Sequence, residues 1–274
     1  MPKRELQMSK ACIENMEKQT VISWLLDSIK ANIAPIAIIL GFIGVWQIVT
    51  IVFDIPTYLL PSPTRVLTAI ANNSVLLYNE TIFTLETVLI GFGLAVAIGI
   101  GLGLLIGYSP FIYKSLSPLI VTINAIPKVA LIPILMIWLG LNVTTNLVTI
   151  FLVSFFPVMM NTYTGLATIE KETKDFFKVI KASRTDLFFK AGIPRAIPYI
   201  LASFKVAITL AIVGAILAET LFGTRGIGYI VLFATKDYRT DLAIGALIII
   251  ALCGVALFGL FSALEKRLCP WAYR

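Results

Sequence analysis

Histidine is absent from this 274-residue sequence, and cysteine is scarce. Without histidine the chain lacks the most common metal ligand and the usual general base. The three cysteines, Cys12, Cys253 and Cys269, are widely scattered without CxxC spacing, which argues against a zinc site or a disulfide framework. No pair of carboxylates, nucleophile–base pair or metal cluster emerges. The sequence therefore predicts neither a catalytic site nor a metal site.

Charge is also scarce: charged residues make up 14% of the chain and hydrophobic residues 58%. A soluble domain has about 25% charged and about 45–50% apolar residues. The apolar runs are long and continuous rather than alternating, and backbone that crosses lipid must form helices or a closed barrel. The sequence therefore predicts an all-α, polytopic membrane protein.

Nucleotide-binding loops are missing as well. No Gly-Lys dipeptide occurs, so the P-loop pattern GxxxxGK[ST] is absent. Gly223, Gly226 and Gly228 follow a predicted membrane span rather than a strand, which argues against a dinucleotide loop. If this protein moves a solute actively, it draws energy from an ion gradient or from a separate ATPase chain.

Six apolar segments approach the roughly 20 residues that a membrane-spanning helix needs. We expect spans at about 33–53, 81–107, 118–139, 143–161, 200–222 and 242–264. Residues 1–32 are expected to form a tail with a short amphipathic helix around Val21–Ile29 and no removable signal peptide. Residues 265–274 form the other tail.

The distribution of Lys and Arg predicts the orientation. With the N-terminus inside, 16 of the 22 lie in the tails and in connectors 108–117 and 162–199, and four lie outside. Because cytoplasmic segments carry the excess of positive charge, both termini and the connector 162–199 are expected in the cytoplasm. This distribution explains most of the net charge of +7 without a nucleic-acid partner.

The connector 162–199 is much longer than a tight turn. Apolar residues recur in it near helical spacing between charges, and Ser183 to Asp186 fit a capping box at a helix start. Gly192 and Pro194 are expected to end that second helix. We predict two short amphipathic helices with a break near Lys181–Ser183. The alternative is a surface loop that shields the bundle.

Small residues recur at every fourth position of the second predicted span. They are Gly91, Ala95, Gly99, Gly103 and Gly107. Such a stripe lets another membrane helix approach closely. We interpret it as a packing surface, within the chain or between subunits.

The third predicted span contains Pro127 and Pro133, with Asn124 and Lys128 nearby. Proline removes an amide donor, and lipid tolerates this only where protein or a water-filled cavity satisfies the backbone. An interrupted span with a cation is a candidate translocation pathway. The alternative is a kink in which Lys128 reaches the headgroups or pairs with a carboxylate.

Two glutamates are the carboxylates considered for that pairing, Glu86 and Glu219. Glu219 lies near the outer end of the fifth predicted span and is a candidate for an outer gate or a dimer contact. Lys205, near the inner end of the same span, is interpreted as structural, since charges near span ends usually reach the interface.

Five stretches together resemble one family. KVIKASRTDLFFKAGIPRAIPYI in the connector resembles the EAA loop of binding-protein-dependent ABC importer permeases. Four further stretches resemble sequences of the permeases in the nitrate, sulfonate and taurine (bicarbonate) transport group. They are YLLPSPTRVLTAI, IPKVALIPILMIWLGL, AILAETLFGTRGIGYIV and LEKRLCPW. The matches cover roughly residues 56–271 in the expected order.

The resemblance implies a type I ABC importer permease fold over residues 33–264, in a bacterial inner membrane. It implies a second copy of the chain, two ATP-binding cassette subunits that bind ATP and Mg²⁺, and an extracytoplasmic binding protein. The chain itself would be neither an enzyme nor a cofactor carrier. The connector would be the ATPase-coupling interface, through Asp175, Phe176, Phe177, Lys181, Ala182, Ser183, Leu187 and Pro194.

The connector departs from the family pattern at two points. The EAA triplet falls on Asp175, Phe176 and Phe177, which keeps the acid and replaces both alanines with large rings. The family's glycine falls on Lys181, which would adopt a positive φ at some cost. The loop would then be more helical, or the partner's groove unusually wide.

The expected function is a permease for a small, anionic solute such as nitrate, a sulfonate, taurine or bicarbonate. A vitamin or pyrimidine precursor is the alternative substrate. A carrier or channel driven by an ion gradient is the alternative mechanism, and a membrane scaffold is a third class that leaves the broken span unexplained. Lys128, Arg225 and Arg239 favour an anion.

Overall fold

The computed structural model describes residues 37–273. Within this range the chain is helical and forms no strand, which confirms the predicted all-α class. The chain divides into two compact units, Met1–Arg65 and Val66–Arg274, and each is described by itself. The amphipathic helix predicted around Val21–Ile29 lies outside the described residues.

The first unit contains the apolar helix Ala37–Val52, followed by a turn in which Asp54 has a φ of 45°. The side-chain amide of Gln47 accepts a hydrogen bond from the Thr64 amide (3.2 Å) and donates one to the Thr64 hydroxyl (3.4 Å). These bonds join the helix to the first turn of α2 (Pro63–Asn72).

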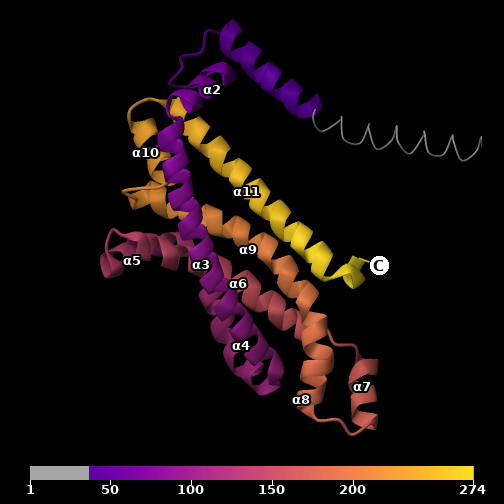
Figure 1. Cartoon of the computed structure of the whole chain (residues 1–274). Helices are drawn as coiled ribbons and strands as arrows, with labels where there is room; N and C mark the ends of the chain where they lie inside the picture. Colours follow the sequence, from indigo (N-terminus) through magenta and orange to yellow (C-terminus); the bar gives the residue numbers. More distant parts are fainter. Residues whose placement is uncertain (1–36, 274) are drawn as a thin grey trace, which may run out of the picture. The chain divides into compact units, whose positions relative to one another are not determined.

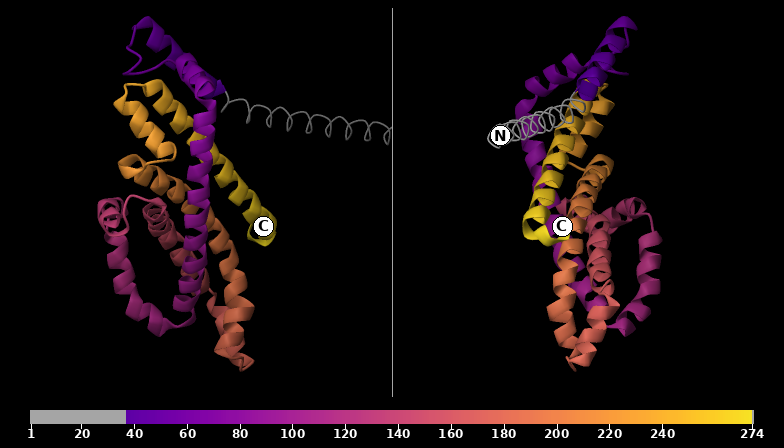
Figure 2. Two further views of the ribbon diagram at one scale, coloured as in Figure 1. Left: turned by 60° about the vertical axis from the view of Figure 1, so that its left-hand side comes forward. Right: turned by 90° about the vertical axis from the view of Figure 1, so that its right-hand side faces the viewer.

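The second unit is built around α3, α6 and α9, which pack against one another along much of their length (Figure 1). Helices α10 and α11 pack against α9, and α7 and α8 lie at the end of the bundle opposite α10 (Figure 2). The elements after α2 are α3 (Ser74–Tyr108), α4 (Pro110–Ala125), η1 (Lys128–Leu131), α5 (Ile132–Leu139), α6 (Val143–Ala167), α7 (Lys171–Val179), α8 (Arg184–Leu187), η2 (Phe188–Gly192), α9 (Ile193–Phe222), α10 (Ile227–Lys236), α11 (Thr240–Leu268) and η3 (Pro270–Tyr273).

The glycine stripe of α3 faces α6. A Cβ added at Gly91 would lie 2.7 Å from a methyl carbon of Ile150, and one at Gly103 would lie 2.5 Å from the Cβ of Thr162. Gly99 meets Val158 in the same way. The stripe is therefore a packing surface within the chain, where close approach replaces the hydrophobic drive that lipid removes.

Four helices in the described part of the chain are long and apolar enough to cross a membrane. They are Ser74–Tyr108, Val143–Ala167, Arg184–Leu221 and Thr240–Leu268. A fifth crossing is counted if α4 and η1–α5, bent by 78°, form one broken span. The first predicted span corresponds to Ala37–Val52, which is apolar but shorter than 18 residues, so a sixth crossing stays a prediction.

The predicted end of the second connector helix at Gly192 and Pro194 is wrong. The helix passes from α8 through one π-helical turn, η2, directly into α9. Pro194 lies in the first turn of α9, and Gly192 has an ordinary helical φ of −64°. A π-helical turn shifts the hydrogen-bond register where proline supplies no amide, so the chain stays helical without the lost bond.

Candidate functional site

Glu219 is fully buried at the α10 end of the bundle. The Thr84 hydroxyl lies 3.0 and 2.9 Å from its two carboxylate oxygens, and the Gly228 amide donates to Oε2 at 2.9 Å. The Thr84 oxygen in turn accepts from the Ile227 amide at 2.9 Å. A buried carboxylate needs such partners, and amides in the first turn of a helix have no partner within that helix. Glu219 thereby joins α3 to the start of α10.

Gly226 completes this arrangement, which we call the Glu219 network (Glu219, Thr84, Glu80, and residues 226–228). Its φ is 102°, and a Cβ added there would lie 2.2 Å from the carboxylate carbon of Glu219. Its amide donates to Glu80 Oε2 at 2.6 Å. The glycines after α9 therefore surround a carboxylate of their own chain. Since Glu219 is fully buried, its side chain offers no surface for the predicted dimer contact.

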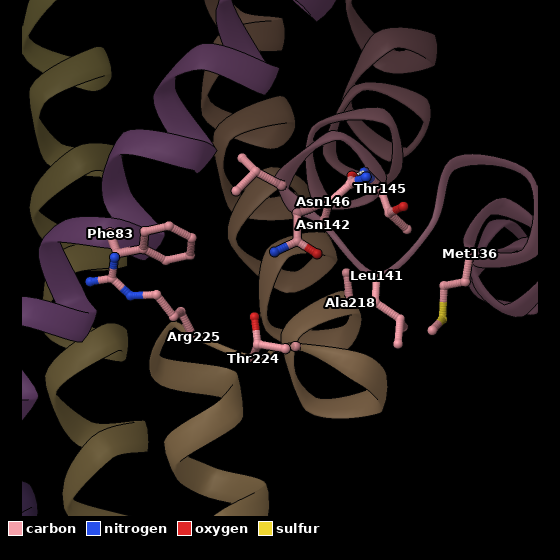
Figure 3. Close-up of a pocket in the computed structure, with 11 residues that line it drawn as sticks. Phe83, Met136, Leu141, Asn142, Thr145, Asn146, Ala218, Thr224 and Arg225 are labelled. Carbon is pink, nitrogen blue, oxygen red and sulfur yellow. Dashed lines mark hydrogen bonds between the residues drawn. The ribbon is translucent and has the colours of Figure 1, made fainter.

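A small pocket lies beside the network, between α3, the α5–α6 loop and the α9–α10 loop. Figure 3 shows Phe83 and Arg225 on one side of it, with Asn142 and Asn146 towards its middle. The guanidinium of Arg225 lies 4.7 Å from the centre of the Phe83 ring, and its Nε is 3.7 Å from Glu80 Oε1.

Asn146 lines this pocket and was not singled out from the sequence. It is only 8% exposed, and its side chain forms no hydrogen bond within residues 37–273. Asn142, by contrast, caps α6 by accepting from the amides of Thr144 and Thr145. A buried amide inside an apolar span is the sequence signal that could have identified Asn146.

Lys128 lies at the break in the third predicted span. Its ammonium group donates to the side-chain oxygen of Asn124 at 2.5 Å and to its carbonyl at 3.2 Å, and lies 5.5 Å from the centre of the Phe156 ring. Lys128 forms no ion pair with Glu86, Glu219 or any other carboxylate among residues 37–273, so the carboxylate-pairing alternative is wrong. The Lys128 ammonium instead satisfies a carbonyl that the break leaves without its helical donor.

Two prolines flank this break. Pro127 precedes η1, and Pro133 lies in the first turn of α5, where a missing amide costs little. Both prolines and Asn124 are exposed. The predicted interruption of this span is confirmed, and the structure brings Asn124, Pro127 and Lys128 together.

The predicted break between α7 and α8 is present, and it turns at Lys181. Lys181 has a φ of 54°. Its amide donates to the Lys178 carbonyl at 3.0 Å, and the Ala182 amide donates to the Phe177 carbonyl at 2.9 Å. These two bonds form a Schellman motif, whose left-handed position is usually occupied by glycine. The positive φ expected at this position is confirmed, and the alternative of a more helical loop is wrong.

The predicted capping box at the start of α8 is also present. The Ser183 hydroxyl accepts from the Asp186 amide at 3.0 Å, and Asp186 Oδ2 accepts from the Ser183 amide at 3.2 Å. Asp175 on α7 pairs with Lys178 at 2.7 Å. Both short helices are thus stabilised by local contacts.

An apolar ridge on α7 is exposed. Phe176, Val179 and Ile180 are 59%, 80% and 53% exposed. Phe177 and Leu187, which were also expected at the coupling interface, are half-buried and do not belong to this ridge. Val179 and Ile180 were missed because helix ends could not be placed closely enough to assign a face.

Lys205 on α9 pairs with Glu265 on α11 at 2.5 Å, and the two side chains are 22% and 8% exposed. Lys205 is therefore held within the bundle by an ion pair between helices, a structural role as expected, although it pairs with Glu265 instead of reaching the interface. Glu265 belongs to the stretch LEKRLCPW, whose acidic residue thus joins the last long helix to the centre of the bundle.

Two transport permeases of known families are similar to this chain in sequence. The ThiX formylaminopyrimidine transport permease protein of Halalkalibacterium halodurans is 29% identical over 238 residues, which are 86% of this chain and 95% of ThiX. The putative aliphatic sulfonates transport permease protein SsuC of Escherichia coli is 30% identical over 253 residues, 92% of this chain and 94% of SsuC.

A solved structure of the MetNI methionine ABC transporter in inward-facing conformations has the same fold. It matches with a TM-score of 0.61 at 14% identity, over 71% of this chain and 96% of that one. The family model for the inner membrane component of binding-protein-dependent transport systems matches residues 95–269. This chain therefore belongs to the family of inner membrane components of binding-protein-dependent transport systems.

Proposed function

We propose that this chain, paired with a second copy of itself, forms the translocation pathway of an ATP-driven importer. Two ATP-binding cassette subunits bind ATP and Mg²⁺ and supply the energy, and an extracytoplasmic binding protein delivers the solute. Membership of the family supports this assignment, because the family consists of the membrane components of such systems.

The proposed orientation places both termini and α7–α8 in the cytoplasm. Sixteen of the 22 Lys and Arg residues support it through the excess of positive charge on cytoplasmic segments. The Glu219 network then lies at the outer end of the bundle. Because it joins α3 to the α9–α10 loop, we assign it the role of holding the outer mouth of the pathway in shape.

The exposed ridge on α7 is the observation that carries the proposal. Three neighbouring apolar side chains, Phe176, Val179 and Ile180, are more than half exposed in a segment rich in Lys. An apolar stripe on a short helix is a typical anchor for a groove on a partner protein. We assign this ridge to the groove of an ATP-binding cassette subunit, with Asp175, Lys181, Ala182 and Ser183 shaping the turn beside it.

The test is co-purification of the partner ATP-binding cassette subunit with the Phe176→Ser and Val179→Ser variants of this chain. Both variants are expected to lose the ATPase subunit while still inserting into the membrane. Phe233→Ser is the control, because Phe233 is 49% exposed but lies on α10 at the opposite end. Retention of the ATPase by the α7 variants, or uptake that survives ATP depletion and collapses with an ionophore, would contradict the proposal.

The solute is proposed to be a small anion. Lys128 at the broken span, which pairs with no carboxylate among the described residues, supplies positive charge near the proposed pathway, and Arg225, shared with Glu80, lies beside the pocket. A pyrimidine precursor is the second candidate, favoured by the similarity to ThiX over 86% of the chain. Binding of taurine, an alkanesulfonate or formylaminopyrimidine to the associated binding protein distinguishes the two, and a cationic ligand would exclude the anion.

A further inference from the structure

A cavity of about 310 Å³ lies at the end of the bundle that carries α7 and α8. Aromatic rings form much of its wall. Tyr113 of α4 and Tyr163 of α6 are stacked, with ring centres 4.3 Å apart and planes 9° apart. Tyr108 of α3 and Phe188 of η2 meet edge to face at 5.2 Å. A largely apolar wall and a volume of about 300 Å³ or more are typical of ligand pockets.

Two cations complete the wall, Lys174 of α7 and Arg184 of α8. Neither forms an ion pair with any residue between 37 and 273. Three neighbouring cations each hold a carboxylate. These pairs are Lys178–Asp175 and Lys190–Asp186 at 2.7 Å, and Arg195–Glu170 at 3.1 Å. Among the connector's seven cations, these three are therefore neutralised, whereas Lys174, Arg184, Lys171 and Lys181 hold no carboxylate in the described part of the chain, and of these four only Lys174 and Arg184 line the cavity.

The wall of this cavity has an apolar part formed by the rings and a positively charged part formed by Lys174 and Arg184. An apolar group against the rings, with a negative charge at Lys174 and Arg184, satisfies both parts of the wall. A guanidinium binds phosphate oxygens in a bidentate way, and a lysine ammonium adds a second donor group.

We propose that this cavity binds a phosphate ester whose apolar portion lies against Tyr113, Tyr163 and Phe188. The ester has two possible sources, an anionic phospholipid of the surrounding leaflet or a soluble phosphate ester. Basic pockets at the cytoplasmic ends of membrane helices are known to hold lipid headgroups. Since the wall draws on α4 and α6 as well as α7 and α8, the bound ligand connects the segment assigned to ATPase docking with the broken span.

The experiment measures ligand retention by the purified full-length protein with native mass spectrometry. The probes are dioleoylphosphatidylglycerol, dioleoylphosphatidylcholine with the same chains but no net charge, and soluble glycerol 3-phosphate. The variant is Lys174→Gln with Arg184→Gln. The control, Lys178→Gln with Lys190→Gln, removes the same charge from cations that do not line the cavity.

We expect the wild type and the control to retain one anionic probe per chain, and the Lys174/Arg184 variant to bind it about tenfold to thirtyfold more weakly. Retention of phosphatidylglycerol alone identifies the lipid as the source, and retention of glycerol 3-phosphate identifies the soluble ester. Equal weakening in both double variants, equal retention of phosphatidylcholine, or no retention of any probe would overturn the proposal.

A second variant keeps the test decisive if loss of both cations impairs folding. Ala167 lines the same cavity and is exposed. Ala167→Phe fills the space without changing the charge, and we expect it to weaken retention of the anionic probe at least tenfold. Unchanged retention in this variant would overturn the proposal as well.

Discussion

The amide of Ala182 donates to the carbonyl of Phe177 across a residue in the left-handed region, at an N–O distance of 2.9 Å. The left-handed residue is Lys181, with a φ of 54°, and the bond ends α7 and turns the chain towards α8. The position matters because the proposed ATPase contacts, Phe176 and Ile180, lie on the turn that it closes.

Lys181→Gly is therefore expected to stabilise the protein. A side chain in the left-handed region costs about 1–2 kcal/mol, and glycine removes this cost. Glycine also makes the unfolded chain more flexible, which offsets about 0.4–1 kcal/mol of the gain. The expected net gain lies between zero and about 1.6 kcal/mol, seen as a higher unfolding temperature of the purified protein.

Lys178→Gly is the matched control, since Lys178 has the same charge but an ordinary helical conformation in α7. Glycine at position 178 should destabilise the protein by about 1 kcal/mol through its low helix propensity. Loss of the Lys178–Asp175 ion pair adds little, because that pair is exposed. A lower unfolding temperature for Lys181→Gly would show that the left-handed lysine is not strained.

Thr84→Val is expected to destabilise the α10 end of the bundle. The substitution keeps the shape of the side chain but removes the donor to Glu219 and the acceptor for the Ile227 amide. Each buried group left unpaired costs about 1–3 kcal/mol. Thermal unfolding measures the loss, and Thr84→Ser, which keeps the hydroxyl, should restore most of it. Equal stability of the valine and serine variants would contradict this role of the hydroxyl.

Features that depend on residues close in sequence could be predicted. The capping box joins Ser183 and Asp186, three positions apart, and the turn at Lys181 is closed by bonds within five residues. Such contacts are fixed by the local backbone, so the order of residue types is enough to reveal them. The break at Pro127 is local for the same reason.

Contacts between distant segments could not be predicted in the same way. Glu219 meets Thr84 across 135 positions, and only the packing of α3 on α9 brings them together. The alternative that paired Lys128 with Glu86 or Glu219 was wrong because Lys128 bonds to Asn124, four residues away, and Glu219 is held by Thr84 and Gly228. The helix expected to end at Gly192 continued, because a π-helical turn is a small change in register that residue types do not reveal.

Gly103→Ala is expected to destabilise the packing of α3 on α6. A Cβ at this position would lie 2.5 Å from the Cβ of Thr162, and overpacking of this kind costs about 1–3 kcal/mol. Gly101 lies on the same helix with nothing within 4 Å of an added Cβ, so Gly101→Ala should be neutral or slightly stabilising. Thermal unfolding of the two variants compares them directly, and equal effects would contradict tight packing at the stripe.

Two variants of the Lys205–Glu265 ion pair distinguish the effect of losing one partner from the effect of replacing both buried charges. Lys205→Met leaves the Glu265 carboxylate buried without its cation, which costs about 3–5 kcal/mol in buried pairs. The double variant Lys205→Met with Glu265→Leu replaces both charges by apolar groups, and replacing a whole buried pair in this way is often neutral. We therefore expect the double variant to unfold at a higher temperature than Lys205→Met alone. If the two losses simply add, each charge contributes on its own, and α9 and α11 are not joined by this pair.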